Sequence, residues 1–426
     1  MPNKSPLVLL SALLIVASSF PTASVPAFAA SKEKVLYSLC PVSGCEGGDF
    51  PIGGVIFDSA GNLYGTAYEG GAHDAGTVFE LSQGTNGTWT ETVLHTFANS
   101  DGSGPLYSMT FDGAGNLFGT TFFGGSAGGG VVFRLRHGAK GWTEDVLHSF
   151  ADGAEGFYPV GALILDAAGN IYGATNATGS SFGAVYQLSP SASGQWNVTV
   201  LHAFSGGRDG ANPDAGLIFD TAGNLYGTTV QGGGTGCGGK GCGTIFELSP
   251  AEGQWREKVL RRFDGTDGAS PAASMIFDIA GNLYGTTAYG GNAGCNPPSG
   301  CGTVFELSPG TNGEWTEKLL HSFRYNPKQP LGTLIFDKSG NLYGTASTGG
   351  PGCDSTGCGR VFELSPGNTG KWTYRVLHDF QNNRIDGNFP ETGMVFDSAG
   401  NLYGTTYEGG SGIWNVGCGT VFEITP

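Results

Sequence analysis

The sequence predicts an all-β fold, a seven-bladed β-propeller in which four antiparallel strands form each blade. Three observations lead to this prediction: a seven-fold repeat, four strand-like runs in each repeat, and an offset between the two ends of the chain. Repeats of four short strands indicate propeller blades rather than a solenoid. The repeat is clearest in one six-residue motif, which occurs as GNLYGT at Gly61, Gly223, Gly281, Gly340 and Gly400, as GNLFGT at Gly115 and as GNIYGA at Gly169.

Each repeat contains four runs with the composition of a strand. In the fifth repeat they are residues 274–277, 282–287, 302–307 and 315–323. The first two runs are joined by Asp-x-Ala-Gly-Asn in most copies, which is typical of a tight hairpin turn whose glycine adopts a positive φ. No stretch after residue 30 has helical periodicity, so we expect essentially no helix.

The two ends of the chain predict how the ring closes. Residues 34–39 resemble the fourth strand of a repeat, and residues 419–425 resemble the third. Seven complete blades result only if the N-terminal strand completes the last blade. Such closure removes a raw sheet edge, whereas an open solenoid would gain nothing from the offset.

Residues 1–30 have the pattern of an export signal peptide. Lys4 precedes an apolar stretch at 7–16, and Ala27-Phe28-Ala29 is a small-x-small cleavage signature. The apolar stretch is too short to span a bilayer, and no later segment is long enough. We therefore expect a signal peptide at 1–30, a single propeller domain at 31–426, no membrane span, and a secreted, extracellular or periplasmic location.

The charge balance limits the partners. All 36 acidic residues but only 19 of the 20 basic ones follow residue 30, so the rest of the chain has a net charge near −17 (19 minus 36). This charge repels nucleic acid and anionic lipid. It is compatible with cations, neutral glycans or basic proteins as partners.

The unit GxLxFDxxGNLYGTTxxGGxxxxGTVFELSPxxxGxWxExVLHxFxGxDGxxP recurs in register from Lys34 to the end of the sequence. It resembles the GloVer tandem repeat of bacterial extracellular proteins. The resemblance implies an extracellular location and a repeat architecture, and it supplies no catalytic residue. Members of that family carry C-terminal anchors, whereas this sequence stops at Pro426, just after a strand, so no surface anchor is expected.

Residues that recur in most copies are interpreted as parts of the blade. Tryptophans at the start of the fourth strand, such as Trp89, are expected to pack between blades. Aspartates before the hairpin, such as Asp58, are expected to accept backbone N–H bonds. Histidines of the fourth strand, such as His95, are kept apart by the ring, so hydrogen bonding is favoured over a metal site. The DGxxP element, which begins at Asp101 in the first repeat, is interpreted as a turn rather than a calcium site.

The nine cysteines of an exported chain are expected to form disulfides. Four pairs are separated by five or six positions: Cys40/Cys45, Cys237/Cys242, Cys295/Cys301 and Cys353/Cys358. Zinc binding is the alternative, disfavoured because the pairs lie in different blades. For the ninth, Cys418, we hypothesise a bond to Cys40 or Cys45 that locks the ring; the alternative is that Cys418 keeps its thiol.

Function is expected on the loops, where the copies differ. Two variable positions follow the second strand and would ring one face near the central channel. Aromatic and carboxylate side chains there suit sugar stacking or a protein partner; the alternative is that they only pack the loops. The candidates for this ligand-binding face are Tyr68, Glu69, Phe122, Phe123, Asn176, Gln231, Tyr289, Tyr407, Glu408 and Trp414.

Three functions remain open: an exported non-catalytic module that binds a glycan or protein, a secreted carbohydrate-active enzyme such as a lyase, glycosidase or lactonase, and a structural envelope component. No nucleophile motif, HExxH or His–carboxylate cluster within one blade is found, so no catalytic residue, metal or cofactor is assigned. Glu69 and Glu408 are the best carboxylate pair, and glycoside hydrolysis would need their carboxyl groups within about 5 to 10 Å of each other. A monomer is expected.

Overall fold

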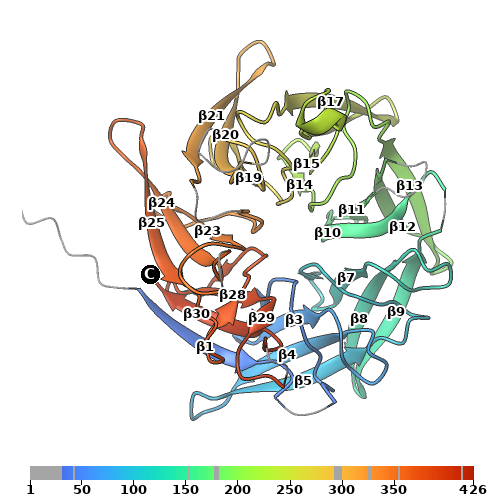
Figure 1. Ribbon diagram of the computed structural model, residues 1–426. Helices are drawn as coiled ribbons and strands as arrows, with labels where there is room; N and C mark the ends of the chain where they lie inside the picture. The colour runs from blue at the N-terminus through green and yellow to red at the C-terminus, as the bar shows by residue number, and fades with distance from the viewer. Residues whose placement is uncertain are drawn as a thin grey trace, which may run out of the picture. The chain divides into compact units, whose positions relative to one another are not determined.

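The computed structural model describes residues 31–41, 44–151, 153–176, 182–291, 300–324, 329–353, 356–413 and 416–426. Within these ranges, seven four-stranded antiparallel sheets lie in a ring, which is the arrangement of a seven-bladed β-propeller (Figure 1). The predicted fold class is confirmed. The one helical element in the described part of the chain is a 3₁₀ turn, η1 (Cys237–Gly239). No helix in those ranges is long and apolar enough to cross a membrane.

The strands of each blade follow one another from the centre of the ring outward. Blade one contains β2 (Ile56–Phe57), β3 (Leu63–Ala67), β4 (Thr77–Gln83) and β5 (Trp89–Thr96). Blade two contains β6 (Thr110–Phe111), β7 (Leu117–Thr121), β8 (Val131–Gly138) and β9 (Gly141–Ser149), and blade three contains β10 (Phe157–Leu165), β11 (Ile171–Asn176), β12 (Ala184–Pro190) and β13 (Trp196–Ala203). Blade four contains β14 (Ile218–Phe219), β15 (Leu225–Thr229), β16 (Thr244–Ala251) and β17 (Gln254–Arg262).

The remaining blades repeat this order, with one exception in the last. Blade five contains β18 (Ile276–Phe277), β19 (Leu283–Thr287), β20 (Thr303–Pro309) and β21 (Trp315–Ser322). Blade six contains β22 (Ile335–Phe336), β23 (Leu342–Ala346), β24 (Arg360–Pro366) and β25 (Trp372–Asp379). Blade seven contains β27 (Val395–Phe396), β28 (Leu402–Thr406), β30 (Thr420–Thr425) and, as its outer strand, β1 (Lys32–Ser38). A small pair, β26 (Gly387–Asn388) and β29 (Glu408–Gly409), lies beside blade seven.

The turn between the two inner strands is fixed by one aspartate in every blade. In blade five, Asp278 accepts hydrogen bonds from the backbone N–H groups of Ala280 and Asn282 at one carboxylate oxygen. The other oxygen accepts from the Asn282 amide and the Tyr284 hydroxyl. Burial on its own would raise the pKa of Asp278, but these hydrogen bonds outweigh it and lower the pKa. The turn function predicted for these aspartates is confirmed.

The second glycine of the repeated motif lets the second and third strands of a blade pack tightly. Gly227 of β15 pairs with Phe246 of β16, and a Cβ atom at Gly227 would lie 2.5 Å from the end of the Phe246 ring. The aromatic ring of Phe246 therefore packs over Gly227, where the second strand has no side chain. Phe246 is fully buried as a result.

Aromatic side chains join neighbouring blades. Tyr226 of blade four packs against Phe277 and Trp315 of blade five, with ring centroids 5.1 and 6.2 Å apart. The same cluster contains Ile245 from blade four and Phe305 from blade five. Because each blade buries its face against the next one, a ring of this kind can hold a long chain without a single large core. The packing function predicted for the tryptophans is confirmed.

The ring closes through its first and last strands. β1 pairs antiparallel with β30, from Lys32 opposite Thr425 to Ser38 opposite Thr420. The blade seven–blade one interface buries Leu39 completely in a cluster that draws on both blades. The N-terminal strand therefore completes the last blade, as the offset of the two ends predicts.

The cysteines follow the predicted pairs where the structure describes them. Disulfides join Cys40–Cys45, Cys237–Cys242 and Cys353–Cys358. Cys301 is also disulfide-bonded, and its predicted partner Cys295 lies outside the described residues.

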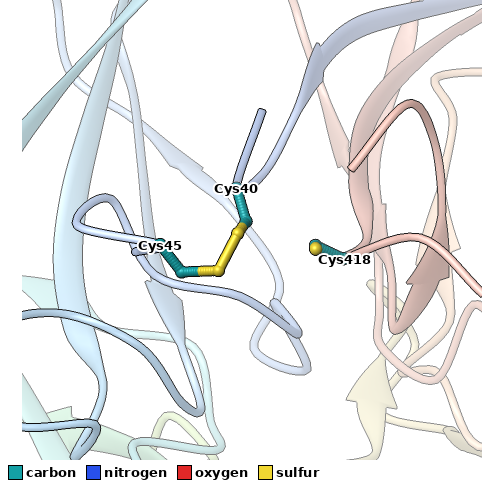
Figure 2. Close-up of side chains that lie close together, drawn as sticks. All are labelled: Cys40, Cys45 and Cys418. Carbon is teal, nitrogen blue, oxygen red and sulfur yellow. A yellow bond between two sulfur atoms is a disulfide. The ribbon is translucent and has the colours of Figure 1, made fainter. Parts of the chain in front are cut away.

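The ring closure brings a third sulfur to the first of these disulfides. Cys418 is buried, and the sulfur atoms of Cys40, Cys45 and Cys418 all lie within 4.8 Å of one another (Figure 2). The disulfide joins Cys40 to Cys45, whose Cα atoms are 4.5 Å apart, rather than joining either of them to Cys418. The ring-locking bond that we hypothesised is therefore not the one formed, although the three residues do meet at the closure as expected.

Candidate ligand-binding site

A cavity of about 210 Å³ lies at the centre of the ring and receives residues from all seven blades. Its walls come from the short segments that follow the proline of each inter-blade loop and lead into the innermost strand. Most of these residues are small, since seven strands converge there. Gly161 shows how close the approach is, because a Cβ atom on it would lie 2.1 Å from the backbone nitrogen of Gly216.

One tyrosine and one aspartate meet inside this cavity. The Tyr107 hydroxyl donates a hydrogen bond to Asp214 Oδ1 over 3.1 Å. Burial and the nearby Asp214 raise the pKa of Tyr107 well above its ordinary value. Burial raises the pKa of Asp214 to about 6, while hydrogen bonds from Tyr107 and Asn176 oppose this increase. Tyr107 is therefore a hydrogen-bond donor at neutral pH, and Asp214 titrates close to neutrality.

A second carboxyl group, that of Glu391, lines the same cavity. Ser347 donates a hydrogen bond to Glu391 Oε1 over 3.3 Å. Burial raises the pKa of Glu391; the Ser347 hydroxyl opposes this increase, and the charge of Glu408 adds to it. Glu391 and Glu408 therefore interact electrostatically at the edge of the cavity.

The residues predicted for the ligand-binding face lie at one end of the ring, where the inter-blade loops enter. Tyr68, Phe122 and Tyr407 each donate a backbone N–H to the residue that precedes the proline of their own blade. In five blades the next position forms an antiparallel backbone bridge to the same loop, at Glu69, Phe123, Gln231, Tyr289 and Glu408. These bridges place the predicted positions at equivalent points around the mouth of the cavity.

Phe122, Phe123 and Tyr158 form an aromatic cluster at this mouth. The Phe122 and Tyr158 rings are stacked with centroids 4.5 Å apart, and Phe123 meets both rings edge-on. Phe123 is nonetheless 39% exposed. Two of the three residues belong to the predicted face, and Tyr158 was not among them.

A second aromatic pair lies at the ring closure. Phe50 and Tyr407 have ring centroids 5.0 Å apart. Asn388 donates a hydrogen bond to Glu408 Oε2 over 3.0 Å, which fixes this carboxylate beside Tyr407. Burial raises the pKa of Tyr407, and the charges of Glu408 and then Glu69 add to the increase.

The predicted carboxylates Glu69 and Glu408 have different surroundings. Burial raises the pKa of Glu69, with contributions from Asp49 and Asp74. Burial also raises the pKa of Glu408, opposed by the Asn388 hydrogen bond. The group that both carboxylates influence is the phenol of Tyr407.

The other predicted residues are divided between the cavity and the rim. Asn176 hydrogen-bonds to Asp214 and so reaches the cavity. The Tyr289 hydroxyl accepts a hydrogen bond from the Gln329 amide over 2.8 Å. Gln231 is partly buried on the rim, and Trp414 lies outside the described residues.

The sequence pattern contains a second signal, which points to the cavity residues. Asp214 and Glu391 directly follow the loop proline, where other copies carry Ile52, Leu106 or Leu331. A carboxylate in place of an aliphatic side chain departs from the repeat as clearly as the variable positions after the second strand.

The comparisons with known proteins concern the repeat and the fold. A family profile described as the Gloeobacter/Verrucomicrobia repeat matches residues 27–240 and 296–426. A solved structure described as a candidate gluconolactonase is similar to this chain at 14% identity, with a TM-score of 0.36 and coverage of 69% of this chain and 83% of that one. A candidate oxidoreductase (glucose dehydrogenase) from Thermus thermophilus is similar at 14% identity, with a TM-score of 0.44 and coverage of 93% and 100%. The comparison with curated proteins gives no match.

Proposed function

Since the chain belongs to the Gloeobacter/Verrucomicrobia repeat family and its repeats form a seven-bladed propeller, we propose that it is an exported, non-catalytic propeller that binds a glycan at the mouth of its central cavity. The observation that carries this proposal is the partly exposed aromatic cluster of Phe122, Phe123 and Tyr158. A protein partner is the alternative occupant, and the experiment below separates the two.

The aromatic cluster suits the apolar face of a sugar ring. A pyranose presents C–H groups on one face and hydroxyl groups at its edge, so it can stack on an aromatic ring and hydrogen-bond around it. Phe122 and Tyr158 pack against Phe123 and hold its ring in place. A platform fixed in this way loses little side-chain entropy when a ligand covers it.

Polar groups on the same rim suit the hydroxyl groups of a glycan. Glu408 and Asn388 offer a carboxylate and an amide in a fixed arrangement, and Glu391 lies within electrostatic reach of Glu408. The excess of acidic over basic residues disfavours polyanionic glycans. We therefore propose neutral or amino sugars as the ligand class.

The test is a glycan array that contains neutral, cationic and anionic glycans, followed by calorimetric titration of the binders with the full chain. Phe123→Ala is expected to weaken binding about tenfold, since covering part of a phenylalanine ring contributes on the order of 1.4 kcal/mol. Ile279→Ala is the matched control, because Ile279 is fully exposed in a hairpin turn between inner strands. A protein that binds the mouth while the array gives no binder would contradict the glycan proposal.

Glycoside cleavage is the second candidate function, since Tyr107, Asp214 and Glu391 line one cavity. The raised pKa of Tyr107 makes its phenol a hydrogen-bond donor rather than a nucleophile, which supports binding over catalysis. A panel of glycosidase, lyase and lactonase substrates tests this point. Turnover by the wild-type chain that is lost in both Asp214→Asn and Glu391→Gln would replace the binding proposal with an enzymatic one.

Export is part of the proposal. Residues 1–30 supply the signal pattern, and the disulfides are compatible with an oxidising compartment. Cell fractionation with N-terminal sequencing is expected to find the protein outside the cytoplasm, beginning near residue 31. Light scattering is expected to give a monomer.

A further inference from the structure

A group of three side chains recurs where the outer strands of neighbouring blades meet. It combines a histidine in the outer strand of one blade, the acidic residue of the following DGxxP element, and a glutamate in the outer strand of the next blade. In two places in the described part of the chain, one nitrogen or oxygen atom from each residue lies within 4.8 Å of the other two. These groups are His95–Asp101–Glu144, between blades one and two, and His378–Asp386–Glu33, between blades six and seven.

The imidazole and the aspartate of each group are already close. His95 Nε2 lies 3.2 Å from Asp101 Oδ2, and His378 Nε2 lies 3.0 Å from Asp386 Oδ2. The aspartates are held by their own loops, since Asp101 accepts a hydrogen bond from the Ala98 backbone N–H.

The glutamates leave a buried oxygen atom in each group. Among the described residues, neither Glu144 Oε1 nor Glu33 Oε1 has a hydrogen-bond partner, although both atoms are buried. A buried acidic oxygen without a donor is costly, so each group has an unused acceptor, as do the outer-strand glutamates Glu91, Glu257 and Glu317 at other junctions. What sets the two groups apart is the imidazole and the second carboxylate close to the glutamate.

The junction between blades four and five shows what these acidic groups accept. There, Arg261 stands in the outer strand where five other copies carry a histidine. Its guanidinium forms ion pairs with both Asp267 and Glu317, and its Nε lies 2.7 Å from Glu317 Oε2. A permanent cation therefore lies between the two carboxylates in this copy.

The junction between blades seven and one shows the converse. Tyr37 takes the place of the histidine and Gly47 takes the place of the DGxxP aspartate. The Tyr37 hydroxyl donates a hydrogen bond to Glu91 Oε2 over 3.1 Å. A Cβ atom at Gly47 would lie 2.0 Å from that same oxygen. Where the second carboxylate is missing, a neutral donor bonds one oxygen of the glutamate, while Glu91 Oε1 has no hydrogen-bond partner among the described residues.

We propose that His95–Asp101–Glu144 and His378–Asp386–Glu33 are inter-blade binding sites for a divalent transition-metal ion such as Zn²⁺. One imidazole nitrogen and two carboxylate oxygens are ligands that Zn²⁺ accepts, with water in the remaining position. The nitrogen ligand disfavours Ca²⁺, which prefers oxygen. The ion occupies the place that the Arg261 guanidinium fills in its own blade, and it links the outer strands of two blades.

The test uses the full chain without reductant, stripped of metal with a chelator and then titrated with Zn²⁺ by calorimetry, with the bound metal measured by mass spectrometry. We expect one ion for each of the two groups. His95→Arg, which copies the Arg261 arrangement, is expected to remove one ion and keep the fold. Arg261→His is expected to add one ion, and Glu144→Gln to weaken one site at least about tenfold.

His73→Ala is the matched control, because His73 is an exposed loop histidine that belongs to neither group. Its zinc content is expected to equal that of the wild type. Circular dichroism of each variant establishes that it has folded. The proposal is overturned if the folded wild-type chain binds no Zn²⁺, or if folded His95→Arg and Arg261→His both keep the wild-type number of ions.

Discussion

Tyr107 of blade two and Asp214 of blade four share a hydrogen bond of 3.1 Å inside the central cavity, although they are 107 positions apart in the sequence and blade three separates them in the chain. The hydrophobic clusters, by contrast, join one blade to its neighbour. This bond is therefore a link between blades that do not follow one another in the ring. It also gives the cavity a defined donor and acceptor.

Removal of the donor tests this link. Tyr107→Phe leaves the Asp214 carboxyl buried without its phenol partner, so we expect a loss of about 1 to 2 kcal/mol in the free energy of unfolding at pH 7. Denaturant unfolding followed by tryptophan fluorescence measures the change. Tyr68→Phe, at the mouth of the same cavity, is the control and is expected to change the stability by less than about 0.5 kcal/mol.

The pH dependence of stability tests the raised pKa of Asp214. Its pKa is about 6 in the folded protein and about 4 in the unfolded chain. Between these values the folded state binds more protons, so this residue's contribution to stability is present below about pH 4 and is lost as the pH rises through about 6.

We expect Asp214→Asn to be more stable than the wild type at pH 7 by on the order of 2 kcal/mol, and the difference to vanish near pH 4. The amide keeps an acceptor for Tyr107. Denaturant unfolding curves of both proteins are recorded between about pH 3.5 and about pH 7.5, in steps of about half a pH unit. They measure the difference in the free energy of unfolding at each pH. A difference that does not change with pH would contradict the assignment.

The hairpin aspartates predict a second, opposite pH effect. Asp278→Ala removes the acceptor for Ala280, Asn282 and Tyr284, and we expect it to destabilise the protein by about 1 to 3 kcal/mol at pH 7. The pKa of Asp278 is lowered in the folded state, so its stabilisation is present above the unfolded pKa and is lost as the pH falls through the folded one. The difference between mutant and wild type is therefore expected to shrink in acid.

The cysteines at the ring closure can be mapped directly. Non-reducing peptide mapping of the native protein is expected to give a Cys40–Cys45 linkage, because this is the disulfide formed beside Cys418 (Figure 2). Cys418→Ser is expected to give the same linkage and serves as the control. A peptide that links Cys418 to Cys40 or to Cys45 would instead establish the ring-locking bond.

The fold was predictable because its information is local and repeated. Each copy carries its own hairpin signal, such as Asp278 followed by Gly281 and Asn282, and seven copies reinforce one interpretation. The offset between the two ends of the chain also predicted that the N-terminal strand, β1, pairs with the last strand, β30. Neither inference required knowledge of contacts between distant side chains.

The cavity and the blade junctions were less predictable, because their residues come from different repeats. Tyr107 and Asp214 meet only after two blades have taken their places in the ring. The histidines occupy one position of the repeat and are kept apart by the ring, whereas His95 has its neighbours in its own loop and in the next blade, at Asp101 and Glu144. A comparison of unlike positions in adjacent repeats would have found that group.

The pairing of β1 with β30 has a consequence for the order of assembly. Blades one to six are each built from one contiguous stretch, so each can form soon after it is synthesised. Blade seven must wait until Thr425 has been made before Lys32 has its partner. Until then an unpaired strand edge persists, and contacts of such long separation form slowly. A circular permutant that places β1 directly after β30 would turn this late, distant encounter into a local hairpin.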